Sequence, residues 1–319
     1  MNILITGAVG FVGQHLMQHL RKVSPEARLH GVVIAPPGEG ALPAHYHTLD
    51  LRDPAAVAAL IDGIPFSRVY HLAAQANVAR SHDHPWETLE NNIRMQVNLL
   101  EAIRHTQAPP RLLIISSGEV YGTDASGEAP PDETSPLRPT SPYSVSKVAQ
   151  DMLGLQYHLA HQLPIMRARP FNHLGPGQAL GFVAPDFAMQ IARIEAGLQD
   201  PVMRVGSLDS ERDFTDVRDI VSAYQLIMDR GIPGEAYNVA SGRTRRIGDL
   251  LEILCKLSTT HITVNQDQSR LRPGKPGKSW GDATKLRETT GWSPQIPLET
   301  TLSDVLNDWR ARVKLEQLT

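Results

Sequence analysis

The sequence predicts an α/β fold built on a doubly wound parallel sheet. Strand-like and helix-like segments alternate through the first half of the 319-residue chain, and a glycine-rich turn joins the first strand to the first helix. Residues 111–116 contain the run Leu-Leu-Ile-Ile, which is typical of a central parallel strand because such a strand is covered on both faces. The alternation favours right-handed crossover connections between parallel strands.

Each element is predicted from the spacing of its apolar residues. Strands are expected at residues 2–6, 29–34, 46–49, 68–72, 111–116, 203–205, 237–239 and 261–264. Helices are expected at residues 11–22, 54–61, 89–105, 141–161, 186–198, 216–228 and 250–257. Glycine and proline gather at residues 175–181 and 273–277, between the helical runs of the second half. The second half is therefore expected to form a different and smaller unit.

Three glycines, Gly7, Gly10 and Gly13, follow the first strand. Glycine permits a tight turn and lets backbone N–H groups approach a pyrophosphate at the N-terminus of a helix. The spacing G-x-x-G-x-x-G is a variant of the dinucleotide-binding fingerprint, and it stands between a strand and a helix as that fingerprint requires. We therefore expect Gly7, Gly10, Phe11, Val12 and Gly13 to bind NADP(H) or NAD(H). A turn that needs glycines only for packing is the less favoured interpretation.

The segment after the second strand leaves the choice between NAD and NADP open. Residues 33–37 read Val-Ile-Ala-Pro-Pro, with neither an acidic residue for a ribose 2′-hydroxyl nor an arginine for a 2′-phosphate. Asp50 and Leu51 follow the third strand and are candidates for contact with the adenine. An aspartate at this place could instead cap a helix.

These features predict two interleaved units. Residues 1–174 are expected to form a dinucleotide-binding Rossmann-type domain, to which elements near residues 214–241 return. Residues 175–319 are expected to form most of a smaller C-terminal substrate domain, interleaved with the last elements of the sheet.

A tyrosine and a lysine four residues apart, Tyr143 and Lys147, form a Tyr-x-x-x-Lys motif. Residues with this spacing lie on one face of a helix, so the lysine ammonium would favour the phenolate and lower the pKa of the tyrosine. Tyr143 is then a candidate general acid or base at a carbonyl or carbinol oxygen. An exposed helix pair is the alternative, and the preceding glycine fingerprint makes it less favoured.

Polar residues also follow the apolar run at residues 112–115, where the carboxyl ends of strands line the ligand crevice of an open α/β sheet. The hydroxyl of Ser117 could share a hydrogen bond with a reacting oxygen. Glu119 could act as a base near a sugar carbon, and a turn carboxylate facing solvent is an equally favoured interpretation of this residue.

Together, motifs across nearly the whole chain resemble the extended short-chain dehydrogenase/reductase family that acts on nucleotide sugars. They are Gly7/Gly10/Gly13, His71-Leu72-Ala73-Ala74-Gln75, Asn92, Ser117, Tyr143/Lys147, Arg169-Pro170-Phe171-Asn172-His173-Leu174-Gly175-Pro176-Gly177, residues 212–219, Tyr237-Asn238-Val239 and Arg272-Pro273. No single motif is specific, but their occurrence together and in this order is.

The resemblance implies roles for the residues that match the family's motifs. It implies that the three glycines hold the coenzyme's pyrophosphate and that the ribose side is lined by Leu72, Ala73, Ala74 and Gln75. It implies that Pro170 and Phe171 flank the nicotinamide, that Lys147 binds the nicotinamide ribose, and that Ser117, Tyr143 and Lys147 form the catalytic triad. The positions that hold the diphosphate and nucleoside of the sugar nucleotide are Asn172, Arg212 and Arg272. A surface ion pair remains the alternative for each arginine.

Within this family the chain most resembles the GDP-4-keto-6-deoxymannose reductases that form GDP-rhamnose, and then the GDP-mannose 4,6-dehydratases. Those dehydratases carry an arginine pair after the Gly-Pro motif, and no such pair stands between Gly177 and Asp186. The dTDP-glucose type of dehydratase has Thr-Asp-Glu where Ser117, Gly118 and Glu119 stand, so the acidic residue that eliminates water is missing. The resemblance therefore implies NAD(P)H-dependent reduction of the C4 keto group of a GDP-4-keto-6-deoxyhexose, which yields a GDP-6-deoxyhexose such as GDP-D-rhamnose.

Three alternatives stay open at this point. Glu119 matches the position of the dehydratase base, so a GDP-mannose 4,6-dehydratase is one of them. A nucleotide-sugar 4-epimerase would use Tyr143 and Lys147 in the same way. A catalytically inactive dinucleotide-binding sensor is less favoured, because such a protein has no need to keep the whole triad. The family also implies a homodimer, with the helices expected at residues 89–105 and 141–161 as its interface.

The composition excludes several classes of function. With 31 Lys and Arg against 34 Asp and Glu, a net charge of −3 is unlike that of a general nucleic-acid binder. No apolar run approaches the ~20 residues of a membrane-spanning helix. A single cysteine, Cys255, excludes an internal disulfide framework and a multi-cysteine metal site. Since the N-terminus shows no basic leader or cleavage site, we expect a cytoplasmic protein with no metal site and no nucleic-acid or membrane partner.

Overall fold

A computed structural model describes residues 1–38, 41–122, 129–267 and 277–318. Its larger part is a seven-stranded, wholly parallel sheet in the order β10-β6-β5-β4-β1-β2-β3. The strands are β1 (Asn2–Thr6), β2 (Arg28–Val33), β3 (His45–Thr48), β4 (Phe66–His71), β5 (Arg111–Ile115), β6 (Ile165–Pro170) and β10 (Ala236–Val239). The strand order reverses between β1 and β4, and ligands of doubly wound sheets bind beyond the carboxyl ends of the strands at such a point. The predicted α/β fold is confirmed.

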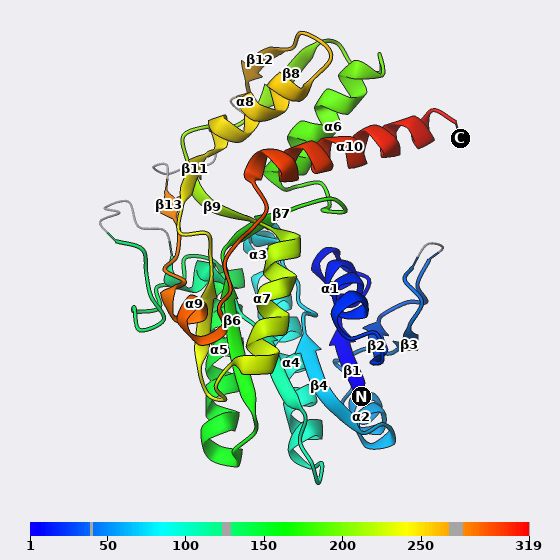
Figure 1. Ribbon diagram of the computed structural model, residues 1–319, viewed down its shortest axis with the longest axis vertical. Helices are drawn as coiled ribbons and strands as arrows, with labels where there is room; N and C mark the ends of the chain where they lie inside the picture. The colour runs from blue at the N-terminus through cyan, green and yellow to red at the C-terminus, as the bar shows by residue number, and fades with distance from the viewer. Residues whose placement is uncertain (39–40, 123–128, 268–276, 319) are drawn as a thin grey trace.

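Helices cover both faces of this sheet (Figure 1). One face carries α1 (Phe11–Val23) and α7 (Val217–Arg230), and the other carries α2 (Pro54–Gly63), α4 (Pro85–Arg104) and α5 (Pro142–His161). The short α3 (Val78–Asp83) and the 3-10 helix η1 (Gly118–Tyr121) lie in the connections after β4 and β5. Each face therefore buries its own apolar cluster against the sheet.

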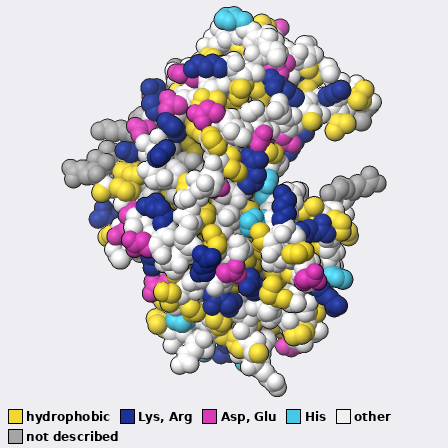
Figure 2. Space-filling view, viewed as in Figure 1, with side chains coloured by type: hydrophobic (Ala, Val, Ile, Leu, Met, Phe, Trp, Pro, Cys, Tyr) yellow, Lys and Arg dark blue, Asp and Glu magenta, His cyan; other side chains and the backbone are white. Residues whose placement is uncertain are grey.

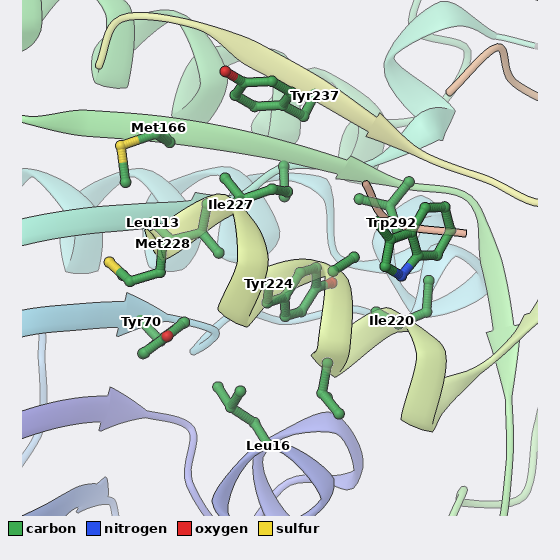
Figure 3. Close-up of a cluster of buried hydrophobic side chains, with 14 of the residues drawn as sticks. Leu16, Tyr70, Leu113, Met166, Ile220, Tyr224, Ile227, Met228, Tyr237 and Trp292 are labelled. Carbon is green, nitrogen blue, oxygen red and sulfur yellow. The ribbon is translucent and has the colours of Figure 1, made fainter. Parts of the chain in front are cut away.

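Large side chains fill the cluster between α7, α1 and the sheet (Figure 3). Tyr224 on α7, Tyr70 on β4 and Tyr237 on β10 are all fully buried in it. Trp292, just after α9 (Thr284–Thr290), is also buried there. The segment around α9 thus packs against the first unit, which interleaves the two parts of the sequence.

The smaller part stands above the carboxyl ends of the large sheet (Figure 1). Its strands are β7 (Asn172–Leu174), β8 (Val202–Val205), β9 (Glu211–Asp216), β11 (Thr244–Arg246), β12 (Thr263–Gln266) and β13 (Lys278–Ser279). β9 pairs with β7, β11 and β13, while β12 pairs with β8. Its helices are α6 (Val183–Glu195), α8 (Ile247–Leu257) and α10 (Leu298–Glu316), which share a third apolar cluster.

All eight expected strands are observed, and each begins and ends within two residues of its expected bounds. Helix α4 begins at Pro85 rather than at residue 89. In the part of the chain that the structure describes, nine elements were not predicted: β6, β7, β9, β11, β13, α3, η1, α9 and α10. Among the described residues, no helix is long and apolar enough to cross a membrane.

Candidate active site

A cavity of about 350 Å³ opens beyond the carboxyl ends of β1, β4, β5 and β6. Figure 2 shows the surface indented between the lobe that carries α10 and the part around α1. The predicted residues that line the cavity are Gly7, Gly10, Phe11, Val12, Gly13, Leu72, Ala74, Ser117, Glu119, Tyr143, Lys147, Pro170, Phe171 and Asn172. The structure therefore brings most of the predicted coenzyme residues and all four predicted catalytic residues to one place.

The glycine turn leaves no room for side chains. Gly7 has a φ of 69°, a left-handed conformation that favours glycine. A Cβ atom on Gly13 would lie 2.2 Å from the carbonyl oxygen of Gly7, so the start of α1 packs directly on the turn. The N-cap residue of α1 is Gly10, which offers no side chain to cap the first N–H groups of the helix. Open N–H donors at a helix N-terminus inside a cavity suit the pyrophosphate of a dinucleotide.

Hydrogen bonds hold the ends of β1 and β4 together beside the turn. The Thr6 hydroxyl lies 2.9 Å from Nδ1 of His71 and accepts a hydrogen bond of 3.0 Å from the backbone N–H of Ala73. Burial lowers the pKa of His71 to about 3, so this imidazole is neutral at neutral pH. These hydrogen bonds fix the backbone at the start of the segment that is predicted to line the coenzyme ribose. Ala73 itself does not line the cavity.

The first turn of α5 positions Tyr143. Ser141 and Ser144 form a reciprocal capping box, and Pro142 occupies the first helical position, which suits a helix start. Lys147 lies one turn further on, and its Nζ donates a hydrogen bond of 2.9 Å to the carbonyl oxygen of Ile115. The same Nζ lies 5.9 Å from the centroid of the Tyr143 ring. The two side chains therefore share one face of α5, as their spacing predicts.

Burial dominates the ionisation of this pair. Burial raises the pKa of Tyr143 to about 12. A hydrogen bond with Ser117 lowers this pKa, and the charge of Glu119 raises it further. Burial also lowers the pKa of Lys147 to about 7. The prediction that Lys147 lowers the pKa of the phenol is therefore wrong for this structure, because loss of solvation outweighs every favourable contact. Tyr143 is consequently protonated at neutral pH and available as a proton donor.

Ser117 and Glu119 are held by η1. The Ser117 hydroxyl caps this helix and accepts a hydrogen bond of 3.1 Å from the backbone N–H of Glu119. Both side chains reach the cavity together with that of Tyr143. A hydroxyl, a carboxyl and a protonated phenol therefore meet at one end of the cavity.

The ring of Phe171 forms one wall of the cavity and has no free space behind it. It stacks on Tyr121 at a centroid separation of 6.2 Å and an interplanar angle of 11°. A Cβ on Gly118 would come within 2.7 Å of the ring, and a Cβ on Gly281 within 2.2 Å. Phe171 thus occupies the volume that a side chain at position 118 would need.

Several predicted site residues do not line the cavity. Asp50 forms an ion pair of 2.6 Å with Arg52, and the hydrogen bonds of this arginine hold the pKa of Asp50 below its usual range. Leu51 is buried in the apolar cluster under α2 and α4. Gln75 does not line the cavity, and its backbone N–H donates a hydrogen bond of 2.7 Å to the side-chain oxygen of Asn92.

Of the two predicted arginines, Arg212 does not line the cavity. Arg212 on β9 donates through Nη1 to the carbonyl oxygens of Glu211 at 2.8 Å and Gly277 at 2.5 Å. Arg272 lies outside the described residues.

Other lining residues were not predicted. His173, Gln178, Phe182, Tyr224 and Ser279 belong to this group. His173 stands inside the motif at residues 169–177, which gave a signal for it, whereas Tyr224 lies in an ordinary amphipathic helix that gave none. Among the described residues, no group of three or more His, Cys, Asp or Glu side chains is placed to hold a metal ion.

A protein-family model described as GDP-mannose 4,6 dehydratase matches residues 4–305. The chain belongs to this family. It is 37% identical to a GDP-6-deoxy-D-mannose reductase of Pseudomonas aeruginosa over 98% of this chain and 99% of that protein. It is 29% identical to GDP-mannose 4,6 dehydratase 2 of Arabidopsis thaliana over 99% of this chain and 88% of that protein.

Solved structures of similar proteins agree with this family. The structure of RMD from Pseudomonas aeruginosa complexed with NADPH superposes with a TM-score of 0.87 at 36% identity, covering 98% of this chain and 99% of that one. A Thermus thermophilus UDP-glucose 4-epimerase in complex with NAD has a TM-score of 0.85 at 26% identity, covering 97% and 99%. The chain therefore belongs with the nucleotide-sugar epimerases and dehydratases, a family whose solved structures include complexes with NADPH and with NAD.

Proposed function

We propose that this protein uses NAD(P)H to reduce the C4 keto group of a GDP-4-keto-6-deoxyhexose, and so forms a GDP-6-deoxyhexose such as GDP-D-rhamnose. The observation that carries the proposal is the shared cavity of Ser117, Tyr143 and Lys147, in which position 118 carries no acidic side chain. The ring of Phe171 fills that volume, so the chain supplies no acid there to expel water from a sugar. The similarity to a reductase at 37% identity over the full length supports the same choice.

The glycine turn and Lys147 fit a nicotinamide coenzyme. The open N–H groups at the start of α1 would hold its pyrophosphate, with Leu72 and Ala74 beside the ribose and Phe171 beside the nicotinamide. When bound, the coenzyme supplies the hydride that reduces the carbonyl carbon. NADPH and NADH are both candidates, because the end of β2 carries no residue that selects between them.

Tyr143 supplies the proton of the reduction. Its phenol is protonated at neutral pH, because burial raises its pKa to about 12. As the carbonyl oxygen gains negative charge, the phenol donates its proton to that oxygen and leaves a phenolate. Ser117, which hydrogen bonds the phenol, and Lys147, one turn along α5, stabilise this negative charge at close range. One hydride and one proton together convert the C4 carbonyl into a hydroxyl.

We place the sugar nucleotide toward the smaller part of the molecule. Asn172 lies at the start of β7 and lines the cavity, and Arg212 lies on the neighbouring strand β9. Both, together with Arg272, are proposed to hold the GDP moiety, since an arginine guanidinium can donate two hydrogen bonds to a diphosphate. In this proposal residues 1–174 form the coenzyme domain, with returning elements near residues 214–241, and residues 175–319 form most of the substrate domain.

Glu119 supports one second candidate, a 4,6-dehydratase, because it places a carboxylate in the cavity beside Tyr143. The two functions differ in their use of coenzyme. A reductase consumes one NAD(P)H for each 4-keto sugar nucleotide, whereas a dehydratase returns its coenzyme to the starting state in each cycle.

The test is to mix purified protein with GDP-4-keto-6-deoxymannose and either NADPH or NADH, and to follow absorbance at the nicotinamide band against product formed. The proposal predicts equal amounts of coenzyme oxidised and GDP-6-deoxyhexose formed. A parallel reaction with GDP-mannose in place of the keto sugar tests the alternative, because its conversion with no net loss of coenzyme would establish the dehydratase.

We also propose a homodimer in which α4 and α5 of two subunits pack together. Val145, Met152 and Leu159 recur every seven residues on α5, and each exposes more than a third of its surface, Leu159 as much as 71%. An apolar stripe on an outer helix is typical of a helix-packing interface. Met152→Arg should shift the sedimentation coefficient from dimer to monomer, while Leu315→Arg, at an exposed leucine on α10, should leave it unchanged.

A further inference from the structure

Tyr224 is a buried tyrosine of α7 that borders the cavity. Its side chain is fully buried, with 0% of its surface exposed, in the cluster between α7, α1 and the sheet (Figure 3). Unlike the rest of α7, Tyr224 also lines the cavity that holds Tyr143 and Lys147. A residue with a polar group thus borders the cavity from the middle of a helix, in addition to those from the loops at the strand ends.

The Tyr224 hydroxyl has no hydrogen-bond partner in the part of the chain that the structure describes. Two other tyrosines of the same cluster do have one: the Tyr237 hydroxyl accepts from the backbone N–H of Ile232 at 2.9 Å, and the Tyr121 hydroxyl donates to Asn238 at 2.8 Å. A buried hydroxyl without a partner destabilises a folded chain, so an unpaired one that borders a ligand cavity is best explained by a partner on the ligand.

The position of Tyr224 favours the coenzyme over the sugar nucleotide as the ligand that contacts it. α7 packs against α1 on the same face of the sheet, and Figure 3 shows Tyr224 on α7 with Leu16 on α1 close by. The start of α1 is the glycine turn, where the coenzyme is proposed to bind. The residues proposed for the sugar nucleotide, Asn172 and Arg212, lie instead on β7 and β9, which contact α7 less extensively than α1 does.

We propose that the Tyr224 hydroxyl is a coenzyme-binding group, which donates a hydrogen bond to an oxygen of the bound nicotinamide coenzyme. The phenol is a donor at neutral pH, because burial raises its pKa above the ordinary value and the neighbouring Tyr143 raises it further. This inference rests on the proposed use of NAD(P)H. It adds a polar contact from α7 to the coenzyme residues proposed above, which come from the glycine turn, the strand ends and α5.

The substitution Tyr224→Phe separates this role from a structural one, since the two predict opposite effects. Removing a hydroxyl that serves only the ligand takes an unpaired polar group out of the core of the coenzyme-free protein. The melting temperature of that protein should therefore stay equal to the wild-type value or rise. Coenzyme affinity should fall about tenfold, the usual effect of losing one hydrogen bond in a buried site.

Two other tyrosines of the cluster supply matched controls. Tyr70 is fully buried and its hydroxyl also has no partner among the described residues, but it does not line the cavity. Tyr70→Phe should leave coenzyme affinity unchanged. Tyr237→Phe removes a hydroxyl that accepts a hydrogen bond, so it should lower the melting temperature by about 2 °C or more and leave coenzyme affinity unchanged.

The measurements are isothermal titration of the full-length protein with NADPH and with NADH, and thermal unfolding without coenzyme. Wild-type protein that binds neither coenzyme would overturn the proposed function and this inference together. Wild-type binding with equal binding by Tyr224→Phe would overturn the inference alone. A lower melting temperature of Tyr224→Phe with unchanged affinity would show that the hydroxyl serves the fold, through an ordered water, and would also overturn it.

Discussion

The carboxylate of Asp151 forms ion pairs with two buried arginines behind the proposed active site. It lies on α5, one turn beyond Lys147, and accepts hydrogen bonds from Nη1 of Arg167 at 2.6 Å and from Nε and Nη2 of Arg169 at 2.8 and 3.0 Å. The three side chains are buried, with exposures of 0%, 6% and 4%. Although burial raises its pKa, the bonds and charges of the two arginines hold the pKa of Asp151 below its ordinary value.

The substitution Asp151→Asn keeps the shape of the side chain and removes its charge. Two guanidinium groups in the core then lose the carboxylate that pairs with both of them, and breaking a buried ion pair in this way costs about 3–5 kcal/mol. Because Arg169 also donates to the hydroxyl of Tyr121, which stacks on Phe171, the change should loosen the wall of the cavity as well.

The assay is the free energy of unfolding from urea denaturation, with Glu90→Gln on the neighbouring helix α4 as the control. Glu90 forms an exposed pair with Arg94 at 3.3 Å, four residues along the helix, and its loss should cost less than about 0.5 kcal/mol. A loss for Asp151→Asn no larger than that of the control would refute this account of the buried cluster.

Three further predictions concern the site and the smaller part. Tyr143→Phe should reduce turnover at least ~100-fold and leave coenzyme binding near the wild-type value, because the proton donor is lost while the cavity keeps its shape; full activity would remove Tyr143 from the mechanism. Gly13→Ala should weaken coenzyme binding measured by titration, since its Cβ would lie 2.2 Å from the Gly7 carbonyl oxygen. The hydrogen bonds and charge of Arg310 lower the pKa of Glu195 to about 2, so the ion pair should stabilise the fold by about 1–2 kcal/mol above pH 4.5. That advantage of wild type over Glu195→Gln in unfolding experiments should shrink as the pH falls from 4.5 toward 2, and a constant difference would contradict the assignment.

The strands of the first half could be predicted because their apolar runs reflect burial against helices on both faces. β6 escaped prediction for a physical reason: its sequence Ile-Met-Arg-Ala-Arg-Pro carries two arginines that suggest a surface segment. Both arginines are buried, and each forms an ion pair with Asp151 of another element. A pairing between segments that meet only in the folded chain leaves no local pattern.

The end of the chain shows a different kind of miss. Leu302, Val305, Leu306 and Trp309 of α10 are buried and have helical spacing, so the signal for this helix was present in the sequence. The short strands β11 and β13 gave no such signal, because they have only three and two residues and exist through pairing with β9.

The residues of the candidate site also fall into those that the sequence could predict and those that it could not. Motif residues such as Gly13 and Lys147 could be placed from the sequence, because their spacing is tied to a turn and to one helix face. The ionisation of Tyr143 could not, since it depends on how completely the folded chain excludes water from the phenol. Tyr224 could not be found either, because a helix pattern shows that a residue is buried but not which cavity it borders.

Net reduction at C4 is the central claim, and isotope transfer tests it most directly. Purified protein is supplied with GDP-4-keto-6-deoxymannose and a coenzyme that carries deuterium at the transferable position of C4 of its nicotinamide ring. The account predicts one deuterium at C4 of the GDP-6-deoxyhexose for each coenzyme oxidised, as measured by NMR and mass spectrometry. Substrate conversion that leaves the reduced coenzyme undiminished and the product free of deuterium would contradict it.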